Sequence, residues 1–194
     1  MALEEVEEVS LAYDHVGSWT LHDVLALGED TQQRVELVGG TLLMSPAPSV
    51  PHQRASRRLA SLLEAAADAA GADVEVLEAV NVVVPDGLLI PDLVVVEAAI
   101  AADAGVTLDS AGVLLAVEIA SPATRATDRK FKPALYSAAG IPSYWRLDLD
   151  PAPTLYIGER QVGGYREDRV ILAGRAATID TPFPLTVDPA RLSR

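Results

Sequence analysis

The chain has 194 residues, of which 49% are hydrophobic, and it carries a formal net charge of −13 at pH 7. A chain of this length and hydrophobicity predicts one domain with a sizeable core. The negative charge argues against nonspecific binding of nucleic acid through bulk charge. The absence of cysteine excludes disulfide bonds and thiolate metal sites.

The sequence contains no uninterrupted apolar stretch of about 18 residues, so we expect no membrane-spanning helix and no membrane partner. The N-terminus is acidic, with four glutamates among its first eight residues, whereas a secretory signal begins with basic residues. We therefore expect a cytoplasmic protein. Residues 1–17 predict a flexible acidic leader, and residues 18–194 predict a single domain.

The first half of the domain predicts a short helix, a hairpin, a long helix and two further strands. The sequence Thr20-Leu-His-Asp23 resembles a capping box, which starts a helix that ends near residue 27. Residues 34–44 predict a hairpin that turns at two glycines. Apolar residues at steps of three and four predict a helix over residues 51–70. Residues 74–84 and 88–97 predict two strands joined by a Pro-Asp-Gly turn.

The second half predicts a strand, a helix, a further strand and a β-rich tail. Residues 98–110 predict a small helix or a loop, and residues 113–120 predict an apolar strand. A helix over residues 127–139 and a strand over residues 143–147 follow. Proline and glycine punctuate the chain from about residue 150, which predicts a small C-terminal β extension. The core order of helix, three strands, helix and strand predicts an α/β (α+β) fold with a mixed central sheet.

Two acidic residues interrupt apolar strands. Asp92 lies in the run 88–96 and Glu118 lies in the run 112–120, and both runs are otherwise nearly all hydrophobic. A buried carboxylate is costly unless a partner compensates its charge. A few carboxylates and water suit Mg²⁺ or Mn²⁺, so a divalent metal is one natural partner. The two carboxylates can meet at one end of the sheet if their strands are neighbours.

The only two lysines of the chain, Lys130 and Lys132, follow Glu118 by 12 and 14 residues. Either ammonium group could neutralise charge on a phosphate and orient the nucleophile, while a metal would polarise the phosphate and activate water. The order Asp, Glu, Lys is the skeleton of a metal-dependent nuclease site. A structural interpretation stays open at each position: a turn for Asp92, a buried arginine partner for Glu118, and solvent for the lysines.

Three further groups extend this hypothesis. Glu36 in the first hairpin either joins the metal cluster or faces solvent. His52 shares the buried stripe of the long helix, where it either contacts a phosphate or a metal-bound water, or is simply packed. Two short segments hold seven basic residues, which form either a basic rim for nucleic acid or solvated helix faces: Arg54, Arg57, Arg58, Arg125, Arg129, Lys130 and Lys132.

An ordered set of short stretches between about residue 19 and residue 157 carries a family resemblance. The stretches are Trp19-Thr20-Leu21, Val35-Glu36-Leu37-Val38-Gly39-Gly40, Met44-Ser45-Pro46, His52-Gln53-Arg54, Ile90-Pro91-Asp92-Leu93, Val117-Glu118-Ile119-Ala120-Ser121-Pro122, Thr124-Arg125, Asp128-Arg129, Lys132, Leu135-Tyr136 and Ala139-Gly140-Ile141-Pro142-Ser143-Tyr144-Trp145. Together they resemble the putative restriction endonuclease family of bacteria, within the PD-(D/E)XK nuclease superfamily.

The resemblance implies a restriction-endonuclease-like αβββαβ core and a catalytic site in which a lysine accompanies three metal-binding acids, Glu36, Asp92 and Glu118. The superfamily's lysine usually lies two residues after the second acid, where this chain has Ala120. The resemblance therefore points to Lys132 on the next helix. It also matches His52 to the family's helix histidine.

The leading hypothesis is a Mg²⁺-dependent (or Mn²⁺-dependent) endonuclease that hydrolyses DNA, with nucleic-acid contacts from Arg54, Arg58, Arg125, Arg129 and Lys130. The alternatives are a catalytically inactive interaction module on the same fold, for which a homodimer stays open, and a hydrolase of a small phosphate ester. Neutralising Asp92 or Glu118 is expected to stabilise a site of clustered carboxylates but to destabilise a structural network.

Overall fold

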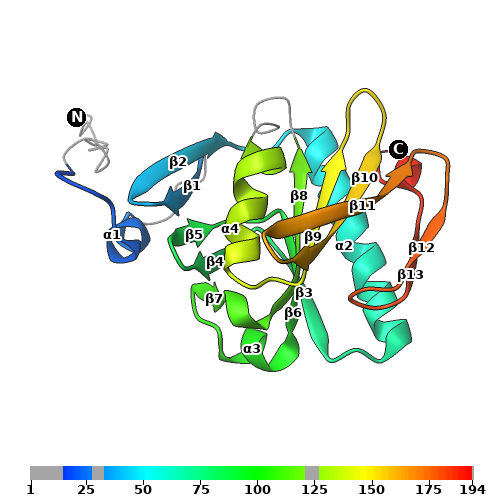
Figure 1. Ribbon diagram of the computed structural model, residues 1–194, viewed down its shortest axis with the longest axis horizontal. Helices are drawn as coiled ribbons and strands as arrows, with labels where there is room; N and C mark the ends of the chain where they lie inside the picture. Colours follow the sequence, from blue (N-terminus) through cyan, green and yellow to red (C-terminus); the bar gives the residue numbers. More distant parts are fainter. Residues whose placement is uncertain (1–14, 28–32, 121–126, 194) are drawn as a thin grey trace, which may run out of the picture.

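The computed structural model describes residues 15–27, 33–120 and 127–193 (Figure 1). Most of the predicted leader lies outside these residues, and so does Arg125 among the predicted nucleic-acid contacts. The described residues form a five-stranded sheet, a six-stranded sheet and a two-stranded sheet, with helices packed against them. This mixed α+β architecture is the predicted fold class.

The N-terminal helix and hairpin have the predicted form. α1 (Leu21–Ala26) begins with a capping box between Thr20 and Asp23, in which each side chain bonds the other residue's backbone amide. β1 (Gln33–Val38) and β2 (Thr41–Pro46) pair antiparallel around a two-glycine turn. This hairpin lies at one end of the molecule, beside α1 (Figure 1).

The second predicted hairpin is wrong, because each of its two predicted strands is divided between two sheets. β3 (Val74–Glu78) and β4 (Asn81–Val84) are separated by Ala79 and Val80, and Ala79 has a positive φ of 52°. β4 pairs with β5 (Gly87–Leu89) in the five-stranded sheet, whereas β3 pairs with β6 (Leu93–Glu97) in the six-stranded sheet. The chain between β3 and β6 therefore joins the two sheets.

The five-stranded sheet has the order β2-β1-β5-β4-β7. β1 meets β5 at two residue pairs. A Cβ atom at Gly87 would lie 1.9 Å from the carbonyl oxygen of Leu37, so only glycine permits this approach. α3 (Ala98–Asp103) leads into β7 (Thr107–Asp109), which pairs parallel with β4, and a 3₁₀ turn (Ser110–Gly112) follows. Residues 98–110 thus form a helix and a strand.

The six-stranded central sheet has the order β11-β10-β9-β8-β6-β3. β8 (Val113–Ala120) pairs antiparallel with β6 and parallel with β9 (Ser143–Asp148), which makes the sheet mixed, as predicted. β10 (Thr154–Gln161) and β11 (Gly164–Leu172) form a hairpin that continues the sheet beyond β9. The first part of the predicted C-terminal extension therefore belongs to the central sheet.

The rest of that extension forms a separate small sheet. β12 (Ala177–Ile179) and β13 (Leu185–Val187) pair antiparallel, and a 3₁₀ turn (Pro189–Arg191) follows them. Side chains of both strands join the hydrophobic cluster beneath α2 (Val50–Ala70). The C-terminal segment therefore covers part of the same face of the central sheet as α2 (Figure 1).

Helices cover both faces of the central sheet. α2 packs on one face, and α4 (Lys132–Ala138) packs on the other (Figure 1). A π-helical turn (Thr127–Phe131) leads into α4, whose second residue, Pro133, lies in the first turn where proline is tolerated. Strands that are buried on both faces read as continuous apolar runs, which explains the sequences of β6 and β8. No helix in the described ranges is both long and apolar enough to cross a bilayer.

Candidate active site

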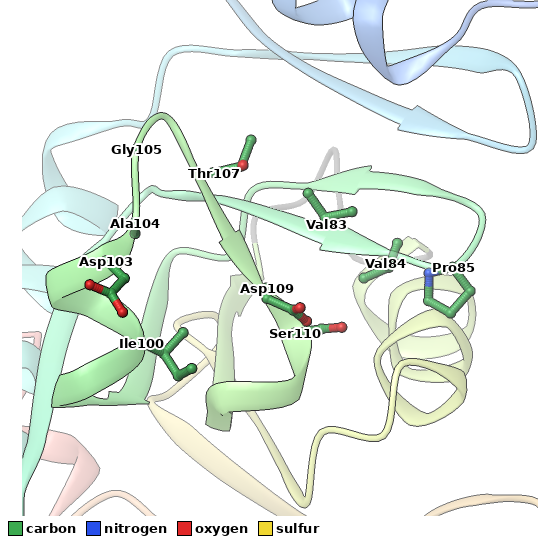
Figure 2. Close-up of a pocket in the computed structure, with 10 residues that line it drawn as sticks. All are labelled: Val83, Val84, Pro85, Ile100, Asp103, Ala104, Gly105, Thr107, Asp109 and Ser110. Atoms are coloured by element: carbon green, nitrogen blue, oxygen red, sulfur yellow. The ribbon is translucent and has the colours of Figure 1, made fainter.

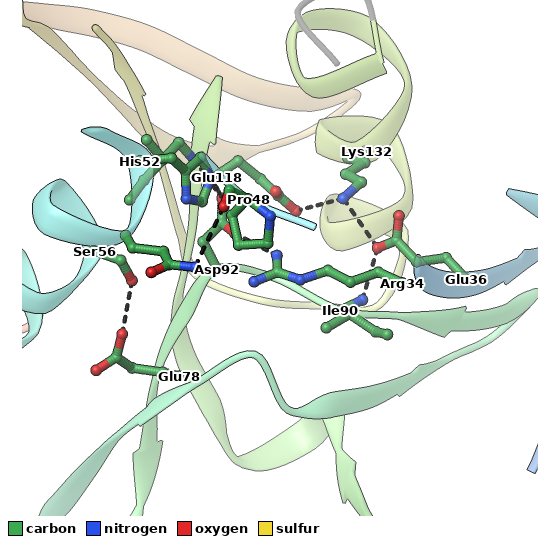
Figure 3. Close-up of polar contacts among 12 residues, drawn as sticks. Arg34, Glu36, Pro48, His52, Ser56, Glu78, Ile90, Asp92, Glu118 and Lys132 are labelled. Atoms are coloured by element: carbon green, nitrogen blue, oxygen red, sulfur yellow. Dashed lines mark hydrogen bonds and ion pairs between the residues drawn. The ribbon is translucent and has the colours of Figure 1, made fainter. Parts of the chain in front are cut away.

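Five predicted site residues converge at one end of the central sheet, beside β1 of the five-stranded sheet (Figure 3). They come from β1, α2, the residue before β6, β8 and α4. All five are buried, with relative exposures of 3% for Glu36, 8% for His52, 4% for Asp92, 3% for Glu118 and 6% for Lys132. This burial excludes the solvent-facing alternatives for Glu36 and Lys132.

Strand pairing places the two central carboxylates beside each other. Leu93 of β6 lies opposite Val117 of β8, so Asp92 comes directly before β6 at the level of Glu118. Oδ2 of Asp92 accepts a hydrogen bond from the backbone N–H of Ile119 at 2.8 Å. The condition set by the sequence, that the two strands be neighbours, is therefore met.

The side chains of Arg34 and His52 hold Asp92. Its Oδ2 lies 3.0 Å from Nε2 of His52, and its Oδ1 accepts a hydrogen bond from Nη1 of Arg34 at 2.5 Å. Burial raises the pKa of Asp92, but the hydrogen bond and charge of His52, the charge of Arg34 and the Ile119 amide together hold that pKa below its ordinary value. Asp92 is therefore an anion at neutral pH.

Lys132 bridges the two glutamates. Its Nζ lies 3.0 Å from Oε1 of Glu118 and 2.9 Å from Oε1 of Glu36, and that Glu36 oxygen also accepts the backbone N–H of Ile90 at 2.7 Å (Figure 3). Burial lowers the pKa of Lys132, but the charges of Glu118 and Glu36 outweigh it and raise this pKa above the ordinary value. The ammonium group therefore stays charged and cannot act as a general base.

The pKa of Glu118 is shifted in the opposite direction to that of Asp92. Burial raises its pKa well above the ordinary value, and the charges of Asp92, Asp128 and Glu36 add to that effect against the opposing charge of Lys132. Three buried carboxylates thus share two fully charged cations, Arg34 and Lys132. A further positive charge at this point would favour the ionised form of Glu118.

Two site residues were missed by the sequence interpretation. Arg34 lies two residues before Glu36, and strand alternation alone would have placed both on one side of β1. Tyr136 lies four residues after Lys132, and helical periodicity would have placed both on one face of α4. Its hydroxyl donates a hydrogen bond to Oε1 of Glu118 at 2.6 Å.

Glu118 does not pair with the buried arginine next to it. Arg146 lies directly opposite Glu118 in β9, but its guanidinium donates to Asp148 at 3.2 Å and to Glu167 at 2.8 Å. The same group lies 4.1 Å from the ring centroid of Tyr156. A buried arginine partner therefore does not explain the acid in β8, which leaves Lys132 and Tyr136 as its contacts.

The predicted nucleic-acid contacts separate into two groups. Arg129 and Lys130 are exposed in the turn before α4, and Nη2 of Arg129 donates to Asp148 at 2.5 Å. Arg54 is exposed on the first turns of α2. Arg58 instead donates to the backbone carbonyl of Arg191 at 3.0 Å, which ties α2 to the C-terminal turn. Arg129 and Lys130 are therefore exposed residues near Lys132 in sequence, whereas Arg58 contacts the C-terminal turn.

The acids of the site include two carboxylates that suit a divalent metal. The described residues hold no group of three acid or histidine side chains arranged to bind one ion. Mg²⁺ usually keeps several waters and needs only one or two carboxylates with substrate phosphate, and Asp92 and Glu118 are two such carboxylates. Both oxygens of Asp92 already accept bonds from Arg34, His52 and Ile119, so a metal at Asp92 would replace at least one of these contacts. Oε1 of Glu36 is occupied by Lys132 and Ile90. Glu36 therefore contacts Lys132, the cation of the site, through that oxygen.

A separate hollow lies on the five-stranded sheet, away from these acids. It has a volume of about 740 Å³ and is lined by Val84, Pro85, Ile100 and Asp109, among others (Figure 2). None of the predicted site residues lines it. This hollow is therefore not part of the candidate site.

Comparison with known proteins decides the family. The sequence model of the family described as "Putative restriction endonuclease" (Uma2) matches residues 21–190. The chain belongs to this family. The membership confirms the resemblance drawn from the short sequence stretches, and the match includes the C-terminal strands that those stretches did not reach.

A solved structure confirms the restriction-endonuclease-like fold. The chain is similar to a crystal structure, at 1.96 Å resolution, of a putative nuclease belonging to DUF820 from Anabaena variabilis. The TM-score is 0.68 and the sequence identity is 17%, over 84% of this chain and 89% of that chain. At this identity the likeness shows the fold. The comparison with curated proteins finds no match.

Proposed function

We propose that this member of the family is a nuclease that hydrolyses phosphodiester bonds of DNA with Mg²⁺ or Mn²⁺ held by Asp92 and Glu118. The observation that carries the proposal is the buried ammonium group of Lys132, which lies between the carboxylates of Glu36 and Glu118. A cation of fixed charge at a cluster of oxygen ligands is suited to stabilising a negatively charged phosphoryl transition state.

Each site residue has a role in the proposal. Asp92 and Glu118 bind the metal, which when bound polarises the phosphate and activates water. Lys132 remains protonated, so it stabilises developing charge and does not take the proton from water. His52 orients Asp92 through Nε2, and Glu36 holds Lys132 in place.

DNA is the proposed substrate, and the exposed turn before α4 is its proposed contact. Arg129 and Lys130 are exposed and lie within three residues of Lys132 along the chain, which supports a role in contacting DNA. Arg54 adds a charge from α2. The net charge of −13 opposes binding of long duplexes, which favours a short or branched target, or a partner that delivers DNA.

A non-catalytic interaction module is the second candidate, and the ion pairs between the three acids and the site's cations favour it. Each of the three carboxylates contacts a cation, so the cluster also satisfies itself as a structural network. Neutralising Asp92 would now strip a partner from Arg34 and His52 whichever function is correct. A loss of stability therefore cannot separate the two functions, and metal binding must do so.

The test is titration calorimetry with Mn²⁺ on the wild type, Asp92→Ala and Glu78→Gln. Glu78 is a matched control, because it is a neighbouring carboxylate that accepts a hydrogen bond from Ser56 at 2.8 Å and contacts none of the three site acids (Figure 3). We expect binding by the wild type and Glu78→Gln, loss of binding by Asp92→Ala, and Mn²⁺-dependent cleavage of DNA by the wild type but not by Lys132→Ala. Absence of wild-type binding, even with a short oligonucleotide to supply phosphate, would favour the interaction module.

A further inference from the structure

One oxygen of Glu118 receives two hydrogen bonds from a single helix. Oε1 accepts from Nζ of Lys132 at 3.0 Å and from the hydroxyl of Tyr136 at 2.6 Å. The two donors are four residues apart, so they lie one turn apart on the same face of α4. Tyr136 is completely buried, with a relative exposure of 0%. The sequence interpretation gave this tyrosine no role.

The two donors act on the same end of the carboxylate. Across the described residues, the hydrogen bonds and ion pairs of Glu118 are made through Oε1 and none through Oε2. A hydrogen bond from a hydroxyl to a carboxylate at this distance is charge-assisted and strong. With Oε1 fixed from two directions, the carboxyl plane cannot turn freely, and Oε2 is the oxygen left to bind a metal.

Tyr136 is itself held in place. Its ring stacks on that of Tyr144 with a centroid distance of 5.8 Å and an interplanar angle of 29°. Its carbonyl accepts the backbone N–H of Ile141 at 3.1 Å. The hydroxyl of Tyr144 donates to the backbone carbonyl of Asp128 at 2.6 Å and to neither Tyr136 nor Glu118, so the stacking with Tyr136 is made by the ring alone. The phenol therefore has a fixed direction toward Glu118.

We propose that Tyr136 is a positioning residue of the metal site, whose hydroxyl fixes Glu118 so that Oε2 is presented to the metal. The inference rests on the proposed function. Partners that orient a metal ligand from outside the coordination sphere typically change metal affinity by 10–100-fold. Tyr136 acts only through Glu118 and contacts neither metal nor DNA.

The experiment compares Mn²⁺ affinity by calorimetry in the wild type, Tyr136→Phe and Tyr144→Phe. Each variant removes one hydroxyl that makes a 2.6 Å hydrogen bond from a buried ring, so both lose one buried hydrogen bond. Only Tyr136→Phe touches a metal ligand. We expect Tyr136→Phe to bind Mn²⁺ about tenfold or more weakly and Tyr144→Phe to bind like the wild type. Cleavage by Tyr136→Phe should recover as Mn²⁺ is raised.

The possible outcomes distinguish failure of the Tyr136 positioning role from failure of the proposed nuclease function. Unchanged Mn²⁺ affinity in Tyr136→Phe, with normal wild-type binding, overturns the positioning role and leaves the nuclease intact. Equal weakening in both variants also overturns it, because the effect is then general. Absence of wild-type binding overturns both proposals.

A second measurement does not require Tyr136→Phe to fold. The near-ultraviolet difference spectrum of the wild type on adding Mn²⁺ should show a perturbed tyrosine, because Mn²⁺ at Glu118 draws charge from the oxygen that the Tyr136 hydroxyl contacts. Tyr144→Phe should retain this spectrum. A wild type that binds Mn²⁺ without any tyrosine signal would contradict the inference.

Discussion

Replacing Lys132 with methionine should destabilise the protein strongly, because it removes the cation between two buried glutamates. The ammonium group lies within 3.0 Å of both Oε1 atoms, and both carboxylates have relative exposures of 3%. Removing one partner of a buried ion pair costs about 3–5 kcal/mol, since the other charge is left uncompensated. Methionine has a similar length and volume, so no large cavity adds to this cost. For a domain of this size, the loss corresponds to a fall in Tm of about 6–20 °C.

The assay is urea unfolding and thermal unfolding of Lys132→Met beside Lys130→Met. The two lysines are the only ones in the chain, and they lie two residues apart, but Lys130 is exposed. Its substitution should change the unfolding free energy by less than about 0.5 kcal/mol. Adding Glu36→Gln to Lys132→Met should restore part of the loss, because one of the two uncompensated carboxylates becomes neutral. Equal stability of Lys132→Met and Lys130→Met would refute the reasoning, as would a double variant less stable than the single one.

Three other predictions test the neighbourhood of the site. Arg34→Ala should destabilise the protein by about 3–5 kcal/mol in urea unfolding, because it leaves Asp92 without its guanidinium partner. The control Arg166→Ala breaks an exposed pair with Asp168 and should cost less than about 1 kcal/mol. Gly87→Ala should fail to form the β1–β5 pairing, because its Cβ would meet the carbonyl oxygen of Leu37 at 1.9 Å; wild-type circular dichroism and Tm in this variant would contradict that. Burial raises the pKa of the Tyr144 and Tyr165 hydroxyls. The stability that they contribute is therefore complete below about pH 10 and is lost as the pH rises through the pKa of the folded state. A free energy of unfolding that stays level above pH ~10 would contradict this.

The sequence predicted the elements well where local chemistry decides them. The capping box at Thr20, the glycine that ends α2 and the apolar run of β8 are all local signals, and these elements lie where they were expected. The division between β3 and β4 and that between β5 and β6 were both missed, and nothing in the sequence around Ala79 indicates a positive φ. The change of sheet at that point is set by tertiary packing.

The candidate site was predicted as a set of residues but not as a pattern of contacts. The acids Asp92 and Glu118 could be found because a charge within an apolar strand needs a partner. Which partner each acid takes depends on how the two sheets meet, and the sequence does not contain that geometry. Arg34 reaches Asp92 only because β1 of the other sheet lies beside the end of the central sheet, and Glu36 reaches Lys132 for the same reason.

The two-sheet construction makes the site easier to dismantle than the core. Arg34 and Glu36 depend on β1, and β1 meets β5 at two residue pairs, whereas β8 pairs along most of its length with both of its neighbours. Undocking of the hairpin would separate Lys132 from Glu36 and Asp92 from Arg34, while the central sheet stays intact. Such partial opening requires less free energy than global unfolding. In rising denaturant, the amide protons of β1 should exchange with solvent before those of β8, and the site should come apart at concentrations where circular dichroism still reports a folded chain.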